Sequence, residues 1–513
     1  MTKNIIAVAQ INVHVGNFEE NLSKIESFIR KAKQGKASIV VFPELAMCGY
    51  PPRDFLEYEF FIEKCEDAIQ KLLQSAKDIH VIVGCPSRNK SGTGRQLFNS
   101  AFHLYDGKVQ NIINKTLLPN YDVFDESRYF ESNTKFQSIL INGQSFGIVI
   151  CEDLWNTKAN SLYGNTPALE LKKLGVDTLI NIAASPFSHD HLQKRIDTLR
   201  EAAIEHQLDI VYCNHIGAQT ELVFDGNSFF MDSKGDVVSM GKGFEEDLLF
   251  SNRKITESVI SGKMDRIQSA IILGIRDYFA KLNFTKALVG LSGGIDSAVV
   301  FALACEALGS ENVLGVLMPS EFSSEHSIAD AQELASNLGA QTHVVSIQSI
   351  FESFNTQLAP VFGNDDFGLA QENLQARTRG TILMGIANKF GHIVLNTSNK
   401  SESAVGYGTL YGDMNGGLSI IGDLYKTEVF ELARHINIER EVIPVNTIVK
   451  PPSAELRPDQ KDSDSLPDYE ILDAILREYI ENKKGKSELV KIGFDSGLVD
   501  RVVKMVNLNE YKR

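Results

Sequence analysis

The stretch with the clearest chemistry is the loop 292–297, Ser-Gly-Gly-Ile-Asp-Ser, which follows the apolar run 287–291 and is called here the glycine loop. That run is typical of a buried β-strand, and the apolar residues after the loop predict a helix that ends at Gly309. A strand, a glycine turn and a helix N-terminus present several free N–H groups at one point, which favours an anion. Asp296 would repel a bare phosphate, so the loop indicates a pyrophosphate held with Mg²⁺. The alternative is an ordinary glycine-rich turn.

A second set of candidate catalytic residues comprises a glutamate, a lysine and a cysteine, each at the end of a predicted strand. These are Glu44, Lys115 and Cys151. A thiol attacks only as the thiolate, and its ordinary pKa of about 8.5 means that a base is needed at neutral pH. A glutamate can act as that base, and a lysine can stabilise an oxyanion. The alternative for Cys151 is an inert cysteine of the core.

The elements that must position these three residues alternate along the first half of the chain. Apolar runs predict strands at 5–10, 38–42, 79–84, 98–105, 108–113, 145–150, 177–182, 209–213 and 226–231, and helical spacing predicts helices at 18–33, 58–77, 166–174 and 192–206. This pattern predicts a layered α/β domain with the sheet inside and the helices outside.

The second half repeats a strand–helix–strand rhythm. After the glycine loop, strands are predicted at 313–318, 342–347 and 392–397, with helices at 324–338 and 370–390 between them. Such a rhythm predicts a doubly wound parallel sheet whose ligand lies at the carboxyl ends of the strands. The segment 251–262 is polar and aperiodic, so we expect domains at 1–250 and 263–513 joined by this connector.

Three local sequences in the first half resemble the nitrilase superfamily. They are Phe42-Pro43-Glu44-Leu45, the segment from Lys115 to Glu126, and Val149 to Trp155. The resemblance covers about the first 250 residues and implies an α-β-β-α sandwich. It implies that Glu44 is the general base, Lys115 the oxyanion stabiliser and Cys151 the nucleophile. Glu126 matches a second glutamate of the family, which positions the lysine and the substrate nitrogen.

The glutaminase branch of that superfamily adds three expected contacts to glutamine. The resemblance implies that Tyr121 and Ser185, the serine of an Ala-Ser-Pro motif, contact the substrate. A lysine often stands six residues after that serine, whereas this chain has His191. We therefore expect His191 at the glutamine contact that the lysine usually makes.

The glycine loop resembles the SGGxDS loop of the N-type ATP pyrophosphatases, which cleave ATP between the α and β phosphates and adenylate a substrate. With further motifs it resembles the synthetase domain of NAD synthetases over about 263–513. The resemblance implies ATP contacts at Gly290, Leu291, Ser292, Gly293, Gly294, Ile295, Asp296, Ser297, Arg377, Thr397, Lys426 and Ser453, and deamido-NAD contacts at Asn373, Glu402, Asp413 and Lys512. It also implies that Asp296 and Glu402 bind Mg²⁺. Ammonia-only members carry a lysine before Tyr-Gly-Asp, where this chain has Leu410.

Together, the two resemblances imply a ligase that takes ammonia from glutamine and transfers it, within the protein, to deamido-NAD activated by ATP and Mg²⁺. The expected products are NAD, AMP, pyrophosphate and glutamate, as in the last step of NAD biosynthesis. Three alternatives differ in class or acceptor: a nucleic-acid-modifying enzyme with the same loop, a binding protein with both sites inactive, and a ligase for another carboxylate or a xanthosine nucleotide.

Composition narrows these alternatives. The chain has 513 residues and a net charge of −15, which argues against a polyanionic nucleic-acid partner. Its six cysteines show no CxxC pair, as is typical of free thiols in a reducing compartment. We find no signal-peptide pattern and no apolar run long enough for a membrane span, so we expect a cytoplasmic protein without a membrane partner. We also expect a homo-oligomer.

Overall fold

The computed structural model describes residues 4–157, 161–253, 262–363 and 367–513. The chain divides into two compact units, Met1–Tyr278 and Phe279–Arg513. Most of the predicted connector 251–262 lies outside the described residues. Helix α5 (Lys263–Lys281) belongs largely to the first unit, where Asp277 accepts hydrogen bonds from the side chain of Asn12 and the backbone of Ala218.

The first unit is built around two six-stranded sheets. In spatial order, one sheet contains β14 (Asp247–Phe250), β1 (Ile6–Gln10), β2 (Ile39–Val41), β3 (His80–Arg88), β4 (Leu97–Tyr105) and β5 (Lys108–Asn114). The other contains β13 (Val237–Met240), β12 (Phe229–Met231), β9 (Asp209–Asn214), β8 (Thr178–Ala183), β7 (Gln144–Ile150) and β6 (Ile139–Ile141). The helices are α1 (Phe18–Gln34), α2 (Glu59–Leu72), α3 (Pro167–Lys173) and α4 (His191–His206), and β10 (Ile216–Gln219) pairs with β11 (Leu222–Asp225).

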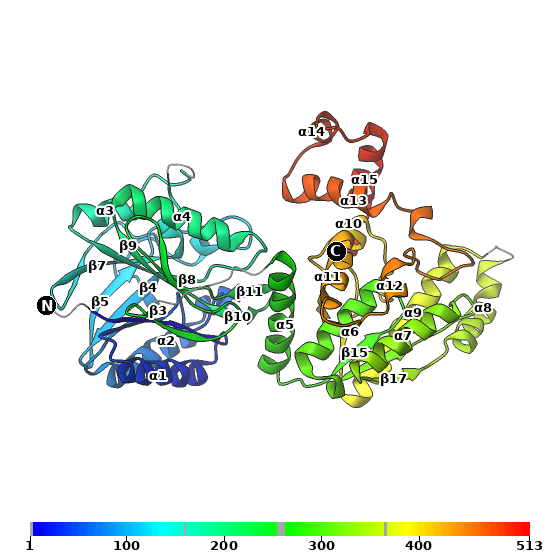
Figure 1. Cartoon of the computed structure of the whole chain (residues 1–513), viewed down its shortest axis with the longest axis horizontal. Helices are drawn as coiled ribbons and strands as arrows, with labels where there is room; N and C mark the ends of the chain where they lie inside the picture. The colour runs from blue at the N-terminus through cyan, green and yellow to red at the C-terminus, as the bar shows by residue number, and fades with distance from the viewer. Residues whose placement is uncertain (1–3, 158–160, 254–261, 364–366) are drawn as a thin grey trace. The chain divides into compact units, whose positions relative to one another are not determined.

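Alternation of side chains along the strands explains the four layers, which Figure 1 shows. In β1, Ile6 and Val8 join the core shared with the second sheet, whereas Ala7 and Ala9 join the core beneath α1 and α2. Successive strand residues point to opposite faces, so a fully apolar strand must be covered on both. Helices α3 and α4 cover the other sheet, for example through Leu199. The expected α-β-β-α sandwich is confirmed.

The second unit has one five-stranded parallel sheet, whose order is β17 (Gln341–Val344), β16 (Val313–Leu317), β15 (Ala287–Gly290), β18 (Ile393–Asn396) and β19 (Leu418–Ser419). Helices α6 (Ile295–Leu308), α7 (Glu325–Leu338), α8 (Gln348–Phe362) and α9 (Leu369–Phe390) connect the strands. After β18 come α10 (Lys400–Val405), α11 (Lys426–Ile436), α12 (Val445–Val449), α13 (Tyr469–Leu476), α14 (Lys486–Lys491) and α15 (Ser496–Leu508).

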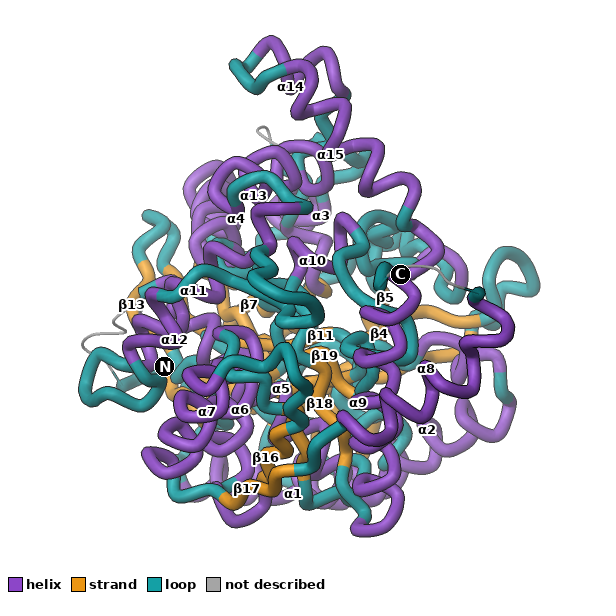
Figure 2. Tube along the Cα trace, turned by 90° about the vertical axis from the view of Figure 1, so that its right-hand side faces the viewer, coloured by secondary structure: helices purple, strands orange, loops and turns teal. Residues whose placement is uncertain are grey.

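The strands are all parallel, but the side on which each new strand is added reverses after β17, and that change of strand order creates a crevice. The connections from β15 to β16 and from β16 to β17 run one way, and the connection from β17 to β18 runs back past β15. Because such crossovers are right-handed, their helices lie on two faces and leave a crevice at the carboxyl ends of β15 and β18. Figure 2 shows β16, β17 and β18 of this sheet near α6, α7 and α9. The expected doubly wound parallel sheet is confirmed.

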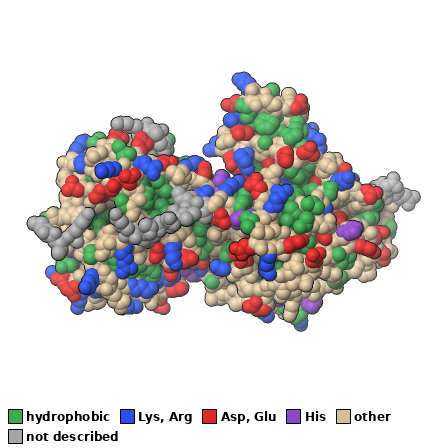
Figure 3. All heavy atoms as spheres, viewed as in Figure 1, with side chains coloured by type: hydrophobic (Ala, Val, Ile, Leu, Met, Phe, Trp, Pro, Cys, Tyr) green, Lys and Arg blue, Asp and Glu red, His purple; other side chains and the backbone are tan. Residues whose placement is uncertain are grey.

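Single elements differ from the sequence-based expectations in detail. The strand expected at 226–231 begins at Phe229, because Gly226 has φ +67° and ends the pairing that β11 makes up to Asp225. The helix expected at 58–77 ends at Leu72 and continues as a short 3₁₀ turn. Across the described ranges, the structure contains no helix with the length and apolar character of a membrane span. Acidic and basic side chains are interspersed on the face shown in Figure 3.

The loop that carries Glu44 packs directly against β3, and this close approach requires glycine at position 84. A Cβ there would overlap the amide nitrogen of Leu45 and lie 2.6 Å from the carbonyl oxygen of Pro43. We therefore expect Gly84→Ala to destabilise the first unit by about 1–3 kcal/mol, which is the usual cost of adding a carbon to a well-packed core. The substitution should also displace Glu44. Thermal unfolding and glutamine hydrolysis would be measured together.

The matched control for this substitution is Gly164→Ala. Gly164 is exposed, and a Cβ there meets nothing within 4 Å, so we expect unchanged unfolding and unchanged hydrolysis. If Gly84→Ala behaved like this control, the contact between β3 and the Glu44 loop would not be what holds the loop in place.

Candidate active sites

In the first unit, the predicted catalytic residues are organised around a buried lysine. Lys115 follows β5, and its Nζ donates to Glu44 Oε1 at 2.7 Å and to a carboxylate oxygen of Glu126 at 2.8 Å. Glu44 and Lys115 are 0% exposed and Glu126 is 5% exposed. A charge this deeply buried must be paired and hydrogen-bonded, and here one ammonium serves two carboxylates.

Neighbouring groups hold both carboxylates in place. Asn99, on β4, donates from Nδ2 to Glu44 Oε1 at 2.7 Å and to Glu126 Oε2 at 3.5 Å. The backbone N–H of Ala184 donates to Glu44 Oε2 at 2.9 Å, and the hydroxyl of Tyr50 donates to Glu126 at 3.0 Å. Every carboxylate oxygen of the pair therefore has a donor, which restricts each side chain to one orientation.

The pKa shifts follow from this arrangement. Burial raises the pKa of the Cys151 thiol well above its ordinary value, Glu44 raises it further, and Lys115 acts in the opposite direction. Burial alone would lower the pKa of Lys115, but Glu126 and Glu44 raise it well above its ordinary value. Burial raises the pKa of Glu126 to about 7. At neutral pH the lysine is therefore charged and the cysteine is a thiol, which needs a base before it can attack.

Cys151 begins the turn after β7 with an unusual backbone conformation. Its φ is +45°, in the left-handed region that residues with a Cβ rarely adopt. Its N–H donates to Asn181 Oδ1 at 2.8 Å, from the neighbouring strand β8. Such strain persists only where the surroundings enforce it, and it is common at functional positions.

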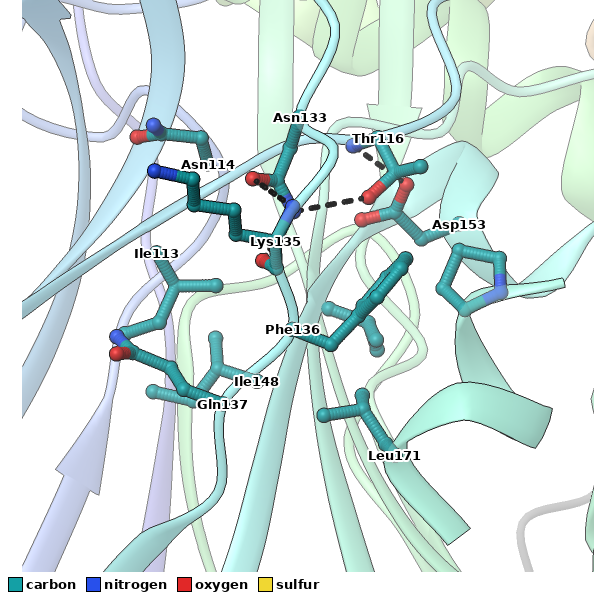
Figure 4. Close-up of a pocket in the computed structure, with 12 residues that line it drawn as sticks. Ile113, Asn114, Thr116, Asn133, Lys135, Phe136, Gln137, Ile148, Asp153 and Leu171 are labelled. Atoms are coloured by element: carbon teal, nitrogen blue, oxygen red, sulfur yellow. Dashed lines mark hydrogen bonds between the residues drawn. The ribbon is translucent and has the colours of Figure 1, made fainter. Parts of the chain in front are cut away.

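Asp153 ties the cysteine turn to the lysine segment. Its Oδ1 accepts from the N–H groups of Thr116 and Leu117 at 2.9 and 2.8 Å, and its Oδ2 accepts from the N–H of Ile150 at 2.9 Å. Figure 4 shows Asp153 beside Thr116 at a cavity of about 10 Å³. That volume holds at most a water molecule, so we assign the cavity a structural role.

The residues expected to contact glutamine form two small networks. In the first, the Tyr121 hydroxyl donates to Glu152 at 2.9 Å, and the Tyr163 hydroxyl donates to the same carboxylate at 3.0 Å. Glu152 adjoins the cysteine and is 3% exposed, whereas Tyr121 is 43% exposed. A carboxylate held between two hydroxyls beside the candidate nucleophile can bind the ammonium group of an amino acid.

Ser185 and His191 form the other network. Ser185 Oγ and His191 Nε2 lie 3.4 Å apart, so the two predicted contacts are neighbours. Burial lowers the pKa of His191 to about 4, with Arg195 acting in the same direction, so the imidazole is neutral at pH 7. Arg195, one helical turn further along α4, forms a buried ion pair with Asp225 at 3.0 Å.

In the second unit, a cavity of about 560 Å³ lies at the carboxyl ends of the strands. That volume is within the range of about 300–1,000 Å³ that is usual for small-molecule sites. All the residues expected to contact ATP or deamido-NAD line it, except Gly293. Leu410, which stands where ammonia-only relatives have a lysine, also lines it.

The glycine loop has the conformation that an anion site needs. Gly293 has φ +81°, and a Cβ there would lie 2.7 Å from Ser327 Cα, so only glycine fits. Gly294 caps α6, whose first N–H groups have no carbonyl partner within the helix. The hydroxyls of Ser292 and Ser297 lie 3.2 Å apart beside this helix end.

Two carboxylates of this cavity have the donor chemistry that Mg²⁺ prefers. Asp296 and Glu402 both line the cavity, and Lys426 Nζ lies 2.5 Å from Asp296 Oδ2 and 3.0 Å from Glu402 Oε1. Mg²⁺ in nucleotide sites is typically held by one or two carboxylates together with phosphate oxygens and water, so these residues fit the ion. Burial raises the pKa of Glu402, and the ammonium of Lys426 acts in the opposite direction and favours the ionised carboxylate.

Four other predicted contacts are oriented by hydrogen bonds to backbone groups and to one hydroxyl around the cavity. Asp413 accepts from the N–H of Thr409 at 2.6 Å, and Asn373 accepts from the Thr409 hydroxyl at 2.8 Å. Arg377 Nε donates to the carbonyl of Leu410 at 3.2 Å. Lys512 Nζ donates to the carbonyls of residues 406 and 408 at 2.7 and 2.8 Å, which brings the C-terminal segment to the cavity.

Sequence reasoning missed several residues of the first site, among them Tyr50, Asp153 and Tyr163 as well as two asparagines and a glutamate. Asn99 and Asn181 lie inside predicted strands, and Glu152 belongs to the cysteine motif without a predicted role of its own. A buried asparagine in an apolar strand is a signal that could have identified the two asparagines, because a buried amide needs partners.

The two units thus define a protein class: a thiol amidase joined to a nucleotide-binding domain of the pyrophosphatase type. A family model described as carbon-nitrogen hydrolase matches residues 5–257, and one described as NAD synthase matches residues 267–513. The chain belongs to the glutamine-dependent NAD(+) synthetases, a family of enzymes.

Full-length relatives support this assignment. Glutamine-dependent NAD(+) synthetases of Synechocystis and of Acinetobacter baylyi are each 42% identical to this chain, over 99% of it and 94% of their own length. The solved glutamine-dependent NAD+ synthetase of Acinetobacter baumannii, in complex with ADP, superposes with a TM-score of 0.83 at 38% identity, covering 99% of this chain and 94% of that one.

The position of Asn99 predicts a loss of glutamine hydrolysis when its amide is removed. Asn99→Ala leaves the Glu44 and Glu126 carboxylates each with one donor fewer, and a buried group that loses a partner costs about 1–3 kcal/mol. We expect kcat with glutamine to fall by about 10- to 100-fold, and ammonia-dependent synthesis to remain. Asn111→Ala is the control, since its side chain contacts His103 instead. An equal loss with ammonia would contradict this role.

His191 allows a test that is specific to this sequence. If His191 replaces a lysine that meets glutamine, His191→Lys should leave the affinity for glutamine similar or better, measured as KM for glutamine hydrolysis. A purely structural histidine would instead give a lower unfolding temperature with unchanged affinity, because a lysine would place a second cation near Arg195.

Proposed function

We propose that this enzyme converts deamido-NAD to NAD, using ATP and ammonia that it releases from glutamine. One observation carries the proposal: a single chain holds both a buried Glu44–Lys115–Glu126 constellation beside a cysteine and a nucleotide-sized cavity around the glycine loop. The names of its full-length relatives support the same activity.

At the first site, Cys151 attacks the side-chain amide carbon of glutamine while Glu44 accepts the thiol proton. Lys115 stabilises the oxyanion that develops on the amide oxygen, and Glu44 returns the proton to the leaving ammonia. Water, activated by the same carboxylate, then hydrolyses the thioester to glutamate and restores the thiol. Glu152 would bind the α-ammonium group of glutamine.

At the second site, the N-terminus of α6 and the loop hydroxyls bind the ATP phosphates. Asp296 and Glu402 would hold Mg²⁺, which supplies charge neutralisation at the phosphates when it is bound. Asn373, Asp413 and Lys512 orient deamido-NAD so that its nicotinate carboxylate attacks the α-phosphorus and releases pyrophosphate. Ammonia then displaces AMP. Adenylation is needed because a free carboxylate is a poor electrophile.

The remaining expectations belong to the same proposal. We assign residues 1–250 to the glutaminase and 263–513 to the synthetase, which the two family models support. This assignment follows the sequence match, so it gives α5 to the synthetase although its residues up to Tyr278 group with the first compact unit. All six cysteines lie in the described part of the chain and are buried free thiols, which supports a reducing cytoplasm. Homo-oligomerisation and passage of ammonia between the sites without release are expected on the family resemblance alone.

Two substitutions separate the two sites. Cys151→Ala removes the nucleophile, so we expect no NAD from glutamine but continued synthesis from ammonium at raised pH, where free ammonia is more abundant. Asp296→Ala removes a ligand at the ATP phosphates, so we expect synthesis from both nitrogen sources to be lost, together with AMP formation. NAD and AMP would be followed in assays with deamido-NAD, ATP and Mg²⁺.

Trapping Cys151 with a glutamine-like electrophile provides the control, since Asp296→Ala should leave that reaction intact. The assignment of the two units would be wrong if folded Cys151→Ala could not use ammonia, or if Asp296→Ala retained synthesis.

A further inference from the structure

A lysine ammonium lies between the two carboxylates assigned to Mg²⁺. Lys426 is the first residue of α11, and its side chain is 3% exposed. Its Nζ contacts Asp296 at 2.5 Å and Glu402 at 3.0 Å, with side chains that are 17% and 15% exposed. The sequence resemblance implies that this lysine contacts the ATP phosphates. In this structure its ammonium instead lies between two carboxylates.

Several elements hold the lysine there. Its backbone N–H donates to Ser401 Oγ at 2.8 Å, and its ammonium lies 5.3 Å from the ring centroid of Tyr469. Asn399 donates to the second carboxylate oxygen of Asp296 at 2.8 Å, which directs the first toward Lys426. The ammonium position is therefore formed by side chains from α6, α10 and α13, as well as by its own helix.

We propose that Lys426 is an internal cation that holds Asp296 and Glu402 together and must leave before a divalent cation can bind to both. The carboxylates are like charges and need a cation between them, while an ammonium beside them repels a second cation. Two carboxylates provide only part of the octahedral shell of Mg²⁺. ATP phosphates supply further oxygen ligands and also a new anionic partner for the displaced ammonium, so metal and nucleotide bind together.

This inference rests on the proposed assignment of Asp296 and Glu402 as metal ligands. The test uses the full-length protein without nucleotide and Mn²⁺ as the probe, with free Mn²⁺ measured by electron paramagnetic resonance. Lys426→Met keeps a side chain of similar length and removes the charge. We expect it to bind Mn²⁺ about tenfold or more tightly than the unsubstituted protein, since a charge this close typically shifts a neighbouring equilibrium by that factor.

Lys400→Met is the matched control. Lys400 is also near this site on α10, but it pairs with Glu481 at 2.9 Å and contacts neither proposed ligand. The substitution removes the same charge from the same unit and should leave Mn²⁺ affinity unchanged.

Two further variants complete the test. Lys426→Arg keeps the charge and should bind Mn²⁺ as weakly as the unsubstituted protein. Lys426→Gln also removes the charge and replaces the methionine variant if that variant does not fold.

Unchanged or weaker Mn²⁺ binding by folded Lys426→Met or Lys426→Gln would overturn the inference. The increase in Mn²⁺ affinity must also disappear when Lys426→Met is combined with Asp296→Asn. If the double variant still bound Mn²⁺ tightly, the ion would be bound at another position. Failure of the proposed function is distinguishable, since it would appear as absence of NAD synthesis by the unsubstituted protein, whatever its Mn²⁺ affinity.

Discussion

The buried ion pairs of Lys115 with Glu44 and Glu126 are the interaction on which the first unit depends. One ammonium compensates two carboxylates that have almost no contact with water, and removing a partner from such a group typically costs about 3–5 kcal/mol. Asn99 adds a neutral donor to both carboxylates. The loop after β2, the end of β5 and the turn at residue 126 are therefore constrained together, and the same contacts that stabilise the sandwich orient the proposed base and oxyanion donor.

The second unit also contains a lysine between two carboxylates, but there the ion pairs are accessible to ligands. Lys426 also lies between two carboxylates, but its partners line an open cavity, where phosphates and a metal ion can compete for them. Lys115 is fixed because it and both of its carboxylate partners are buried, and every oxygen of those carboxylates has a donor. The same pairing therefore gives a rigid site in one unit and an exchangeable one in the other, and the difference is access to solvent and ligand.

Much of the architecture follows from patterns that are local in sequence. Fully apolar strands such as 146–150 and 287–290 must be covered on both faces, which predicts layers, and Gly293 permits the turn before α6. The first and last residues of strands and helices were harder to predict than the elements themselves. Phe229 begins its strand later than expected because the backbone at Gly226 adopts a positive φ that hydrophobicity does not encode.

By itself, the sequence determined both fold classes and singled out Glu44, Lys115, Cys151 and the glycine loop as candidates, because motif spacing and strand periodicity are local properties. Only the tertiary structure decided that Asn99 bridges two glutamates and that Lys426 lies between Asp296 and Glu402. Those contacts join residues 24 to 130 positions apart. They depend on which strand ends meet and on where a buried charge finds its partner, and these are fixed by packing and by the low dielectric of the interior.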